Sequence, residues 1–465
     1  MIINSEKLYD FIIIGSGVSG SIMAHDLLDQ GYSCLLLEAG EFFSRSNFPR
    51  KEIDANSKLY WSGGAEFNKT TNIAFLRPKV VGGGSIVNQA LLDRFDDIAL
   101  NDFQKTSQIN FFNQEAMSPW YEKAEAGIHQ ETIDPKYRNR NAEIFAKGFA
   151  ANGYNCASLT RAQNNCRYEE GNDCIECLGG CRADSKQSML ITYLKKALNN
   201  GLEMMSLFEA KSIEEKPEYI LVNGVYNKFA HKTFKARKVV LASGAIGNTK
   251  LLKSSGFDKD YPALGKNFYT HPQFMVLAEF KDQINSHKGP FQSMKSADSG
   301  FRQKGFKLEN VFAPPVALSM LFKGFGKEHM ALMKKISHMG CIEVAVRDTH
   351  PGEIKLRRGK LSIYKTLNEE DKKRRAAGIE AIYNIFESQG ALNIMEGNLP
   401  IGLHLMGGCS VGSDSEKSVV SPDFHLHEHK NIICADSSIF PNAPGINPSL
   451  TIMALSKMAA AKVGF

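Results

Sequence analysis

The feature that most constrains the fold is a glycine-rich turn between two apolar segments near the start of the chain. Residues 9–40 read YDFIIIGSGVSGSIMAHDLLDQGYSCLLLEAG: an apolar run, glycines at the spacing GxGxxG, a helix-like segment and a second apolar run ending at Glu38. Strand, glycine turn, helix and strand in this order, with an acid about 20 positions on, are typical of a dinucleotide-binding unit. Gly15 permits the tight turn, Gly17 lets backbone N–H groups approach a pyrophosphate, and Gly20 lets helix and strand pack closely.

Glu38 narrows the class of nucleotide. A carboxylate at the end of the second strand can accept both ribose hydroxyls and repels a 2′-phosphate, so FAD or NAD is favoured over NADP. The chain then makes a long excursion instead of continuing with another regular strand and helix. That continuation favours a flavoprotein.

Length and composition limit the remaining possibilities. A chain of 465 residues is long enough for two or three domains, and 43% hydrophobic and 23% charged residues are ordinary for a globular protein. The formal net charge of +6 is small and the basic residues are scattered, so nucleic acid is not an expected partner. A cytoplasmic location is expected, because no secretory leader or long apolar run is present and several of the nine cysteines lie singly within apolar runs.

Four further stretches carry a resemblance to a known family. They are RPKVVGGGSIVNQALLDR (77–94), FKARKVVLASGAIGNTKLLKSSG (234–256), ALGKNFYTHP (263–272) and the C-terminal block 403–463. In this order they resemble the signatures of the glucose-methanol-choline (GMC) oxidoreductases. The first has Gly84 where the family usually has serine.

The resemblance implies an α/β fold with a Rossmann-like FAD-binding domain and a second, smaller α+β substrate domain built on an antiparallel sheet. We expect residues 1–100, 186–275 and 398–465 to form the FAD-binding domain, and residues 101–185 and 276–397 the substrate domain. In the latter, alternation in residues 352–366 predicts a hairpin, and the apolar spacing of residues 368–391 predicts an amphipathic helix.

The cofactor is expected to lie against glycine turns and a helix N-terminus. A GGG turn lets the backbone approach a flat ring or a phosphate, because no Cβ intervenes. The helix expected after Pro448 would direct its positive end at the ring, which stabilises the charge of reduced flavin by about 0.3–1 kcal/mol. The residues expected to contact FAD are Gly15, Gly17, Val18, Ser19, Gly20, Glu38, Ala39, Gly83, Gly84, Asn88, Lys211, Ala245, Asp436 and Pro448.

By resemblance, the catalytic residues are His404 and Asn447. Oxidation of a CH–OH group needs a proton acceptor with a pKa near neutral while hydride passes to flavin N5. His404 occupies the family's position for the active-site histidine, and Asn447 the position of a second His or an Asn, so His404 would be the general base and Asn447 would hydrogen-bond the alkoxide. His271, in THP, is expected to have a structural part. A flavin-containing lyase without net oxidation and a nicotinamide-dependent dehydrogenase are the alternatives.

Four cysteines at the spacing C-x7-C-x2-C-x3-C form a separate candidate site: Cys166, Cys174, Cys177 and Cys181. The pattern resembles both GMC relatives that act on long-chain or sterol-like alcohols and the flavin subunits of bacterial sugar dehydrogenases, which carry an iron–sulfur centre. Thiolates on short loops suit a [3Fe–4S] or [4Fe–4S] cluster or zinc, and disulfides or free thiols are the alternatives. A cluster would favour an external electron acceptor, and its absence would favour O₂.

The segment 311–340 is apolar, rich in methionine and interrupted by lysines. Such a segment can line a channel for a hydrophobic substrate, contact a membrane surface or pack in the core. All three interpretations are compatible with a small-molecule alcohol as substrate.

Overall fold

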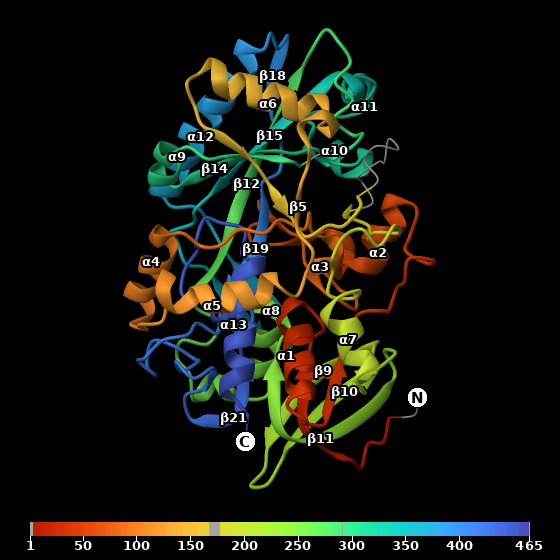
Figure 1. Cartoon of the computed structure of the whole chain (residues 1–465), viewed down its shortest axis with the longest axis vertical. Helices are drawn as coiled ribbons and strands as arrows, with labels where there is room; N and C mark the ends of the chain where they lie inside the picture. The colour runs from red at the N-terminus through yellow and green to blue at the C-terminus, as the bar shows by residue number, and fades with distance from the viewer. Residues whose placement is uncertain (1–2, 167–176, 291, 465) are drawn as a thin grey trace.

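Two β-sheets lie at opposite ends of an elongated molecule in the computed structural model (Figure 1). The structure describes residues 3–166, 177–290 and 292–464. The first sheet has the strand order β20-β21-β11-β1-β2-β8, and β10 and β9 follow on β11. Its strands are β1 (Leu8–Ile14), β2 (Cys34–Leu37), β8 (Glu203–Met205), β9 (Phe208–Glu215), β10 (Ile220–Tyr226), β11 (Ala230–Leu241), β20 (His425–Leu426) and β21 (His429–Cys434).

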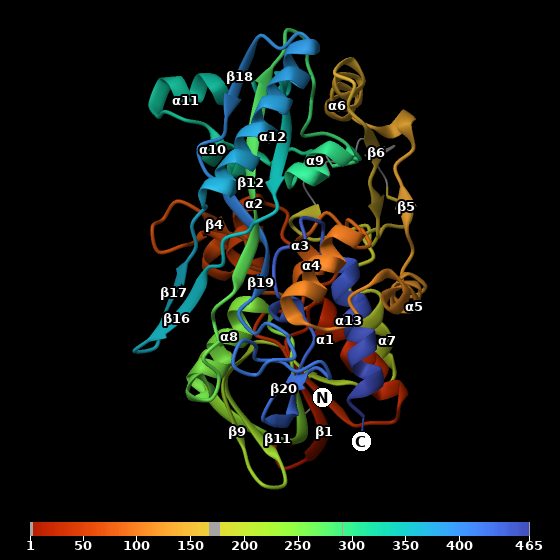
Figure 2. The same cartoon turned by 90° about the vertical axis from the view of Figure 1, so that its left-hand side faces the viewer.

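The first sheet has a parallel centre. Strand β1 pairs in parallel with β2 and β11, which in turn pair in parallel with β8 and β21. Figure 2 shows α1, α7 and α13 on one side of this sheet and α8 on the other. Both faces of the central strands are therefore covered, which is why β1 and β2 consist almost wholly of apolar residues. The helices are α1 (Val18–Asp29), α7 (Tyr193–Asn199), α8 (Gly244–Ser254) and α13 (Ser449–Lys462), with α4 (Asp97–Ser107) and α5 (Gln114–Glu125) beside them.

The second sheet is mainly antiparallel, with the order β3-β4-β19-β12-β15-β14-β13-β6 and β18 also on β12. Its strands are β3 (Glu66–Phe67), β4 (Ala74–Phe75), β6 (Cys156–Ser158), β12 (Phe268–Glu279), β13 (Met294–Ser296), β14 (Phe306–Asn310), β15 (Met339–Val346), β18 (Asn393–Glu396) and β19 (Ile401–Gly407). Parallel and antiparallel sheets in one chain confirm the predicted fold class. The residue ranges of the two domains stay a prediction.

The two faces of the second sheet differ in what covers them. Helices α6 (Arg140–Ala151) and α12 (Glu369–Ser388) pack on one face in an apolar cluster with alternate residues of β12, β14 and β15. On the other face, α10 (Pro315–Leu321) covers only the part of the sheet away from the first sheet. The rest of that face carries the polar side chains described below.

The two local predictions for the substrate region are confirmed. Residues 352–366 contain the hairpin of β16 (Glu353–Arg357) and β17 (Lys360–Tyr364), and residues 368–391 contain α12. The Asn368 side chain accepts a hydrogen bond from the Asp371 N–H at the start of α12, which satisfies a donor that the helix leaves unpaired. None of the helices in the described ranges has both the length and the apolar character that a transmembrane span requires.

Candidate functional site

The glycine turn lies between β1 and α1. Some of its glycines are closely packed against neighbouring backbone, and one faces open space. A Cβ on Gly15, whose φ is +105°, would lie 2.3 Å from the Ala242 carbonyl oxygen, and a Cβ on Gly20 would lie 1.9 Å from the Gly15 oxygen. A Cβ on Gly17 would meet no atom within 4 Å. The open side of this turn thus faces the N-terminus of α1, which begins at Val18, as a pyrophosphate site requires.

Glu38 ends the adjacent strand and is buried. Its carboxylate accepts hydrogen bonds from the Ser16 N–H and hydroxyl (2.9 and 2.7 Å) and from the Gly40 N–H (2.7 Å). Burial raises the pKa of Glu38, against the effect of these donors. Three bonds leave room for about one more donor on a carboxylate, which suits a ribose hydroxyl. In the first turn of α1, the buried Ser19 hydroxyl has no hydrogen-bond partner within the described residues, and Ala39 is half-buried.

The GGG segment packs directly on the glycine turn. The Gly82 N–H donates to the Ser16 hydroxyl (2.9 Å), and a Cβ on Gly83, whose φ is +54°, would lie 2.6 Å from Gly17 Cα. Helix α3 (Gly84–Val87) follows, and Asn88 ends it. The two glycine segments, about 65 residues apart, therefore share one edge of the first sheet.

The remaining predicted cofactor contacts lie at the start of α8 and on β9. Gly244 N–H and Asn248 Nδ2 donate to the buried Asp436 carboxylate (2.7 and 3.0 Å), at the start of α8, where Ala245 is buried. Lys211 is half-exposed on β9 and pairs with Glu209 (2.8 Å). The cofactor roles of these residues stay predictions.

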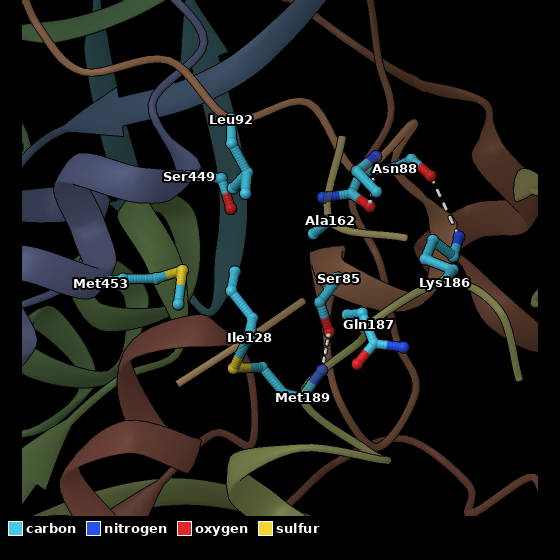
Figure 3. A pocket seen from close by; sticks show the side chains of 11 residues that line it. Ser85, Asn88, Leu92, Ile128, Ala162, Lys186, Gln187, Met189, Ser449 and Met453 are labelled. Atoms are coloured by element: carbon cyan, nitrogen blue, oxygen red, sulfur yellow. Dashed lines mark hydrogen bonds between the residues drawn. The ribbon is translucent and has the colours of Figure 1, made fainter. Parts of the chain in front are cut away.

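A small pocket lies beside the GGG segment (Figure 3). It brings Asn88 and Ser85 together with Ser449 and Met453 of α13, and Gln187 forms part of its wall. Pro448 precedes α13, so the positive end of this helix faces the pocket region.

His404 is held in an unusual backbone conformation and contacts His271. The β12–β19 register shifts between Tyr269 and His271, and His404 has a φ of +54°. The Nδ1 atoms of His271 and His404 are 2.9 Å apart, and the rings are nearly perpendicular. Burial, followed by the charge of Lys307, lowers the pKa of His404 to about 3, and burial followed by His404 lowers the pKa of His271 well below its usual value.

Asn447 lies two residues beyond Gly445, whose N–H donates to His271 Nε2 (2.9 Å). Asn447 Nδ2 donates to the carboxylates of Asp93 (2.9 Å) and Glu309 (3.3 Å). His271 thus bonds both to His404 and to the backbone two residues before Asn447, which brings together two chain segments whose residues His404 and Asn447 are 43 positions apart in sequence.

A charged cluster beside this group was not predicted from the sequence. We define the acid–lysine cluster as Asp93, Lys295, Lys307, Glu309 and Glu343. Lys307 pairs with Glu309 (2.6 Å), and Lys295 pairs with Asp93. Burial opposes ionisation of Asp93, but Lys307 and Lys295 hold its pKa below the usual value.

Glu343 faces Glu309 across strands β15 and β14 in the acid–lysine cluster. Burial, followed by the charge of Glu309 on the facing strand, raises the pKa of Glu343 well above its usual value. The Glu343 carboxyl therefore favours its protonated form more than a solvent-exposed glutamate does. Its sequence signal is an acid in the middle of the apolar run GCIEVAV (340–346), where a carboxyl group must be buried.

Beyond the polar groups, the same sheet face bears an apolar cavity. His271, Gln273 and Met275 alternate along β12, so they share one face. A cavity on this face is lined by Met275, Val311, Phe312, Ala313, Ala317, Leu318, Leu321, Cys341 and Ile401. The segment 311–340 thus supplies both core residues and a cavity wall, whereas its Phe325 is 90% exposed.

The predicted cysteine site is described only in part, because Cys174 lies outside the described residues. The structure describes Cys166, Cys177 and Cys181, of which Cys177 is buried and the other two are half-buried. Arg161 Nη2 and Gln163 Nε2 donate to Cys177 Sγ (3.8 and 3.9 Å). Within the described ranges there is no group of three or more His, Cys, Asp or Glu side chains able to hold a metal ion, so the predicted cluster has no support there.

Family models, sequence relatives and a solved structure all connect this chain with one protein family. Models of the GMC oxidoreductase family match residues 9–273 and 352–456. A long-chain-alcohol oxidase of Arabidopsis thaliana is 25% identical over 96% of this chain and 67% of its own length, and a GMC-type oxidoreductase of Sinorhizobium fredii is 26% identical over 96% and 93%. The crystal structure of pyridoxine 4-oxidase from Mesorbium loti superimposes with a TM-score of 0.73 at 14% identity, covering 97% of this chain and 98% of that one.

The two family models together span both glycine segments and both predicted catalytic positions. The chain therefore belongs to the GMC oxidoreductase family and is an FAD-dependent oxidoreductase that acts on CH–OH groups.

Proposed function

We propose that this enzyme oxidises the CH–OH group of an alcohol with a sizeable apolar body, and that His404 and Asn447 contact the hydroxyl. The observation that carries the proposal is the convergence of these two residues on a sheet face that continues into the apolar cavity. Polar groups at one end and an apolar wall at the other match the two ends of such a substrate.

Other residues of the chain bind the cofactor and exclude water from the site. Bound FAD supplies the two-electron oxidant. Backbone groups at Gly17 and Gly83, with Glu38, hold its nucleotide part, and the N-terminus of α13 places positive potential beside Asn447. The cavity walls exclude water from the reacting group, which strengthens every hydrogen bond made there.

The apolar cavity supports a hydrophobic substrate over a sugar. Carbohydrate recognition needs several polar groups, whereas the cavity residues are all apolar apart from the small thiol of Cys341. Several of the relatives are long-chain-alcohol oxidases of Arabidopsis thaliana, and one is a cholesterol oxidase of Acinetobacter baumannii.

The electron acceptor is proposed to be O₂, as the names of these oxidases suggest. The alternative is an external acceptor reached through an iron–sulfur cluster at the cysteines. Measurement of iron and acid-labile sulfide in anaerobically purified protein separates the two. About three or four irons per chain would establish the cluster and overturn the simple oxidase proposal.

The proposal is tested by His404→Ala in the FAD-loaded enzyme with primary alcohols of increasing chain length. Turnover should fall about 10²–10⁴-fold, because a polar group that acts on the hydroxyl is lost, while the flavin content stays unchanged. His404→Asn is the control for the backbone, since Asn tolerates a positive φ. Undiminished turnover in His404→Ala would refute the assignment.

The lyase alternative is distinguished in the same assay. An oxidase or dehydrogenase reduces O₂ or an electron-accepting dye in proportion to the alcohol consumed. If no alcohol in the series reduces either acceptor, a lyase of the same fold becomes the better assignment.

Contact with an anionic membrane surface is a further part of the proposal. The exposed apolar residues next to the cavity wall are Met320 on α10, Phe325 directly before α11 (Gly326–Met333) and Met330 on α11. The exposed lysines Lys323, Lys327, Lys334 and Lys335 accompany a single acid, Glu328, between residues 320 and 335. Apolar tips among lysines fit anionic lipid, which is also where an apolar alcohol partitions.

A further inference from the structure

A buried amide on the polar face of the second sheet has no hydrogen-bond partner. Gln273 lies on β12, two residues after His271 and on the same face, and is only 3% exposed. Its side chain makes no hydrogen bond within the described residues, and its Oε1 atom is fully buried. Buried polar groups are almost always paired, because an unpaired one loses its bonds to water without replacement. The Gln273 amide is therefore available to a ligand.

The neighbours of Gln273 place it between the reacting end of the site and the apolar cavity. Ile401, its partner on β19, lines the cavity, and so does Met275, the next residue of β12 on the same face. In the other direction along β12 lies His271, which contacts His404. Alternate residues of a strand are about 6.6 Å apart, the length of a few carbon–carbon bonds. An alcohol that extends from His404 into the cavity therefore passes Gln273 within its first carbons.

A second buried atom without a partner lies beside this place. Glu343 pairs with Met275 across β15 and β12, so it shares the face of Gln273 and lies diagonally opposite it. Glu343 is 2% exposed, and its Oε1 atom has no hydrogen-bond partner within the part of the chain that the structure describes. Long side chains reach across such a diagonal. A ligand group between Gln273 and Glu343 can thus bond to both.

The charges around Gln273 favour a neutral ligand group. In the acid–lysine cluster, Lys307 pairs with Glu309 and Lys295 pairs with Asp93. A carboxylate or ammonium group of a substrate would add an unpaired charge to this buried place, which is costly. An amide presents N–H donors and a carbonyl acceptor, and a hydroxyl is both an acceptor and a donor. A neutral hydroxyl group therefore suits the Gln273 amide.

We propose that Gln273 binds a second hydroxyl group of the substrate, and that the preferred substrate is an apolar diol whose two hydroxyls are a few carbons apart. The amide N–H of Gln273 donates to the second oxygen, and Gln273 Oε1 or Glu343 Oε1 accepts from its O–H. The second hydroxyl undergoes no chemical change. This inference rests on the proposed function and deepens it, because the hydroxyl that is oxidised stays at His404 and Asn447.

The proposal is tested with the FAD-loaded enzyme and four substrates of equal length. The kcat/KM of decan-1-ol is compared with those of decane-1,2-diol, decane-1,3-diol and decane-1,4-diol. A site that hydrogen-bonds a substrate hydroxyl discriminates against the analogue that lacks it. At least one diol should therefore be preferred over decan-1-ol about 10- to 100-fold. If no diol reaches about a 10-fold preference, the Gln273 amide does not bind a substrate hydroxyl, and the proposal is overturned.

A matched pair of substitutions assigns the preference to Gln273. Gln273→Met keeps the length of the side chain and removes both hydrogen-bonding groups, so the preference for the diol should fall about 10-fold or more. Gln283→Met, the same substitution at an exposed position, should keep the wild-type preference. Flavin content shows whether each variant is folded, and Gln273→Leu replaces Gln273→Met if the latter does not fold. A diol preference that persists without the amide would overturn the role of Gln273.

The two levels of inference fail separately. If neither decan-1-ol nor any diol reduces the flavin, the proposed function is refuted. If decan-1-ol and the diols reduce the flavin equally well, the enzyme oxidises apolar alcohols and only the site at Gln273 is refuted.

Discussion

The glycine-turn edge of the first sheet and the polar face of the second sheet use different parts of the chain to contact a ligand. At the edge of the first sheet the site is formed by backbone and open space. Gly17 leaves an opening, while Gly15 and Gly20 permit close packing. At the second, buried side chains hold one another, from His271 and His404 to the acid–lysine cluster. Local chain geometry thus suffices for one region, whereas the other depends on pairing between distant strands.

The largest expected effect tests the second region. The Lys307 side chain is only 13% exposed, so replacing it with Met leaves Glu309 buried without its cation and leaves Asp93 with Lys295 as its remaining cation. The free energy of unfolding should fall by about 3–5 kcal/mol in chemical denaturation. The matched control is Lys216→Met, in an exposed pair with Glu214, which should cost less than about 1 kcal/mol. Equal losses in both variants would mean that the acid–lysine cluster contributes no more than a surface pair.

The next effect tests the first region. Gly20→Ala places a Cβ against the Gly15 carbonyl and should destabilise the protein by about 1–3 kcal/mol. Gly17→Ala should leave the flavin-free protein as stable as the wild type, because its site is open and its φ is −65°. Flavin release, followed by fluorescence, should increase in Gly17→Ala. If instead Gly17→Ala alone were destabilising, Gly17 would be the glycine needed for close packing, and Gly20 would not.

A pH effect of intermediate size comes from His404. Its pKa is about 3 in the folded protein against 6.5 for the ordinary group, so the unfolded chain binds a proton between these values and the folded protein does not. Stability should therefore fall as the pH falls below 6.5, by about 1 kcal/mol from pH 6.5 to 5.5 for this residue. Unfolding curves of His404→Asn should lose this dependence.

The control for this measurement is His231→Asn, a substitution of an exposed histidine, which should follow the wild-type pH dependence. A His404→Asn curve parallel to that of the wild type would mean that His404 is accessible to protons in the folded protein.

The smallest effect on stability is expected at Phe325. Because this side chain is 90% exposed, Phe325→Ser should change the free energy of unfolding by less than about 0.5 kcal/mol. Sedimentation with vesicles that contain phosphatidylserine should nevertheless decrease relative to the wild type. Binding to neutral vesicles should be weak for both proteins, and equal binding of the variant to anionic vesicles would exclude Phe325 from a lipid contact.

The sequence was sufficient where neighbouring residues decide the outcome. The glycine turn, the hairpin at residues 352–366 and the helix within residues 368–391 each depend on residues within one short window, and the structure contains all three. The fold class followed from the order of such segments and from the family resemblance.

The polar site could be predicted only in part, because its partners come from separate strands. The pairing of Glu309 with Glu343 depends on the register of β14 and β15, and Asp93 reaches the same place from the chain that follows the GGG segment. His271 was expected to be structural, yet its contact with His404 depends on the register shift in β19. Periodicity within a strand gives the face of a residue but does not identify its neighbour on the next strand.

The left-handed backbone at His404 also restricts the evolutionary routes open to this site. At a φ of +54°, Asn, Asp and Gly are the accessible replacements, whereas β-branched residues are strongly disfavoured. A lineage that abandons the histidine by single substitutions would therefore pass mostly through small polar side chains or glycine. To reach a branched apolar residue at position 404, it would first have to remodel the strand that carries it.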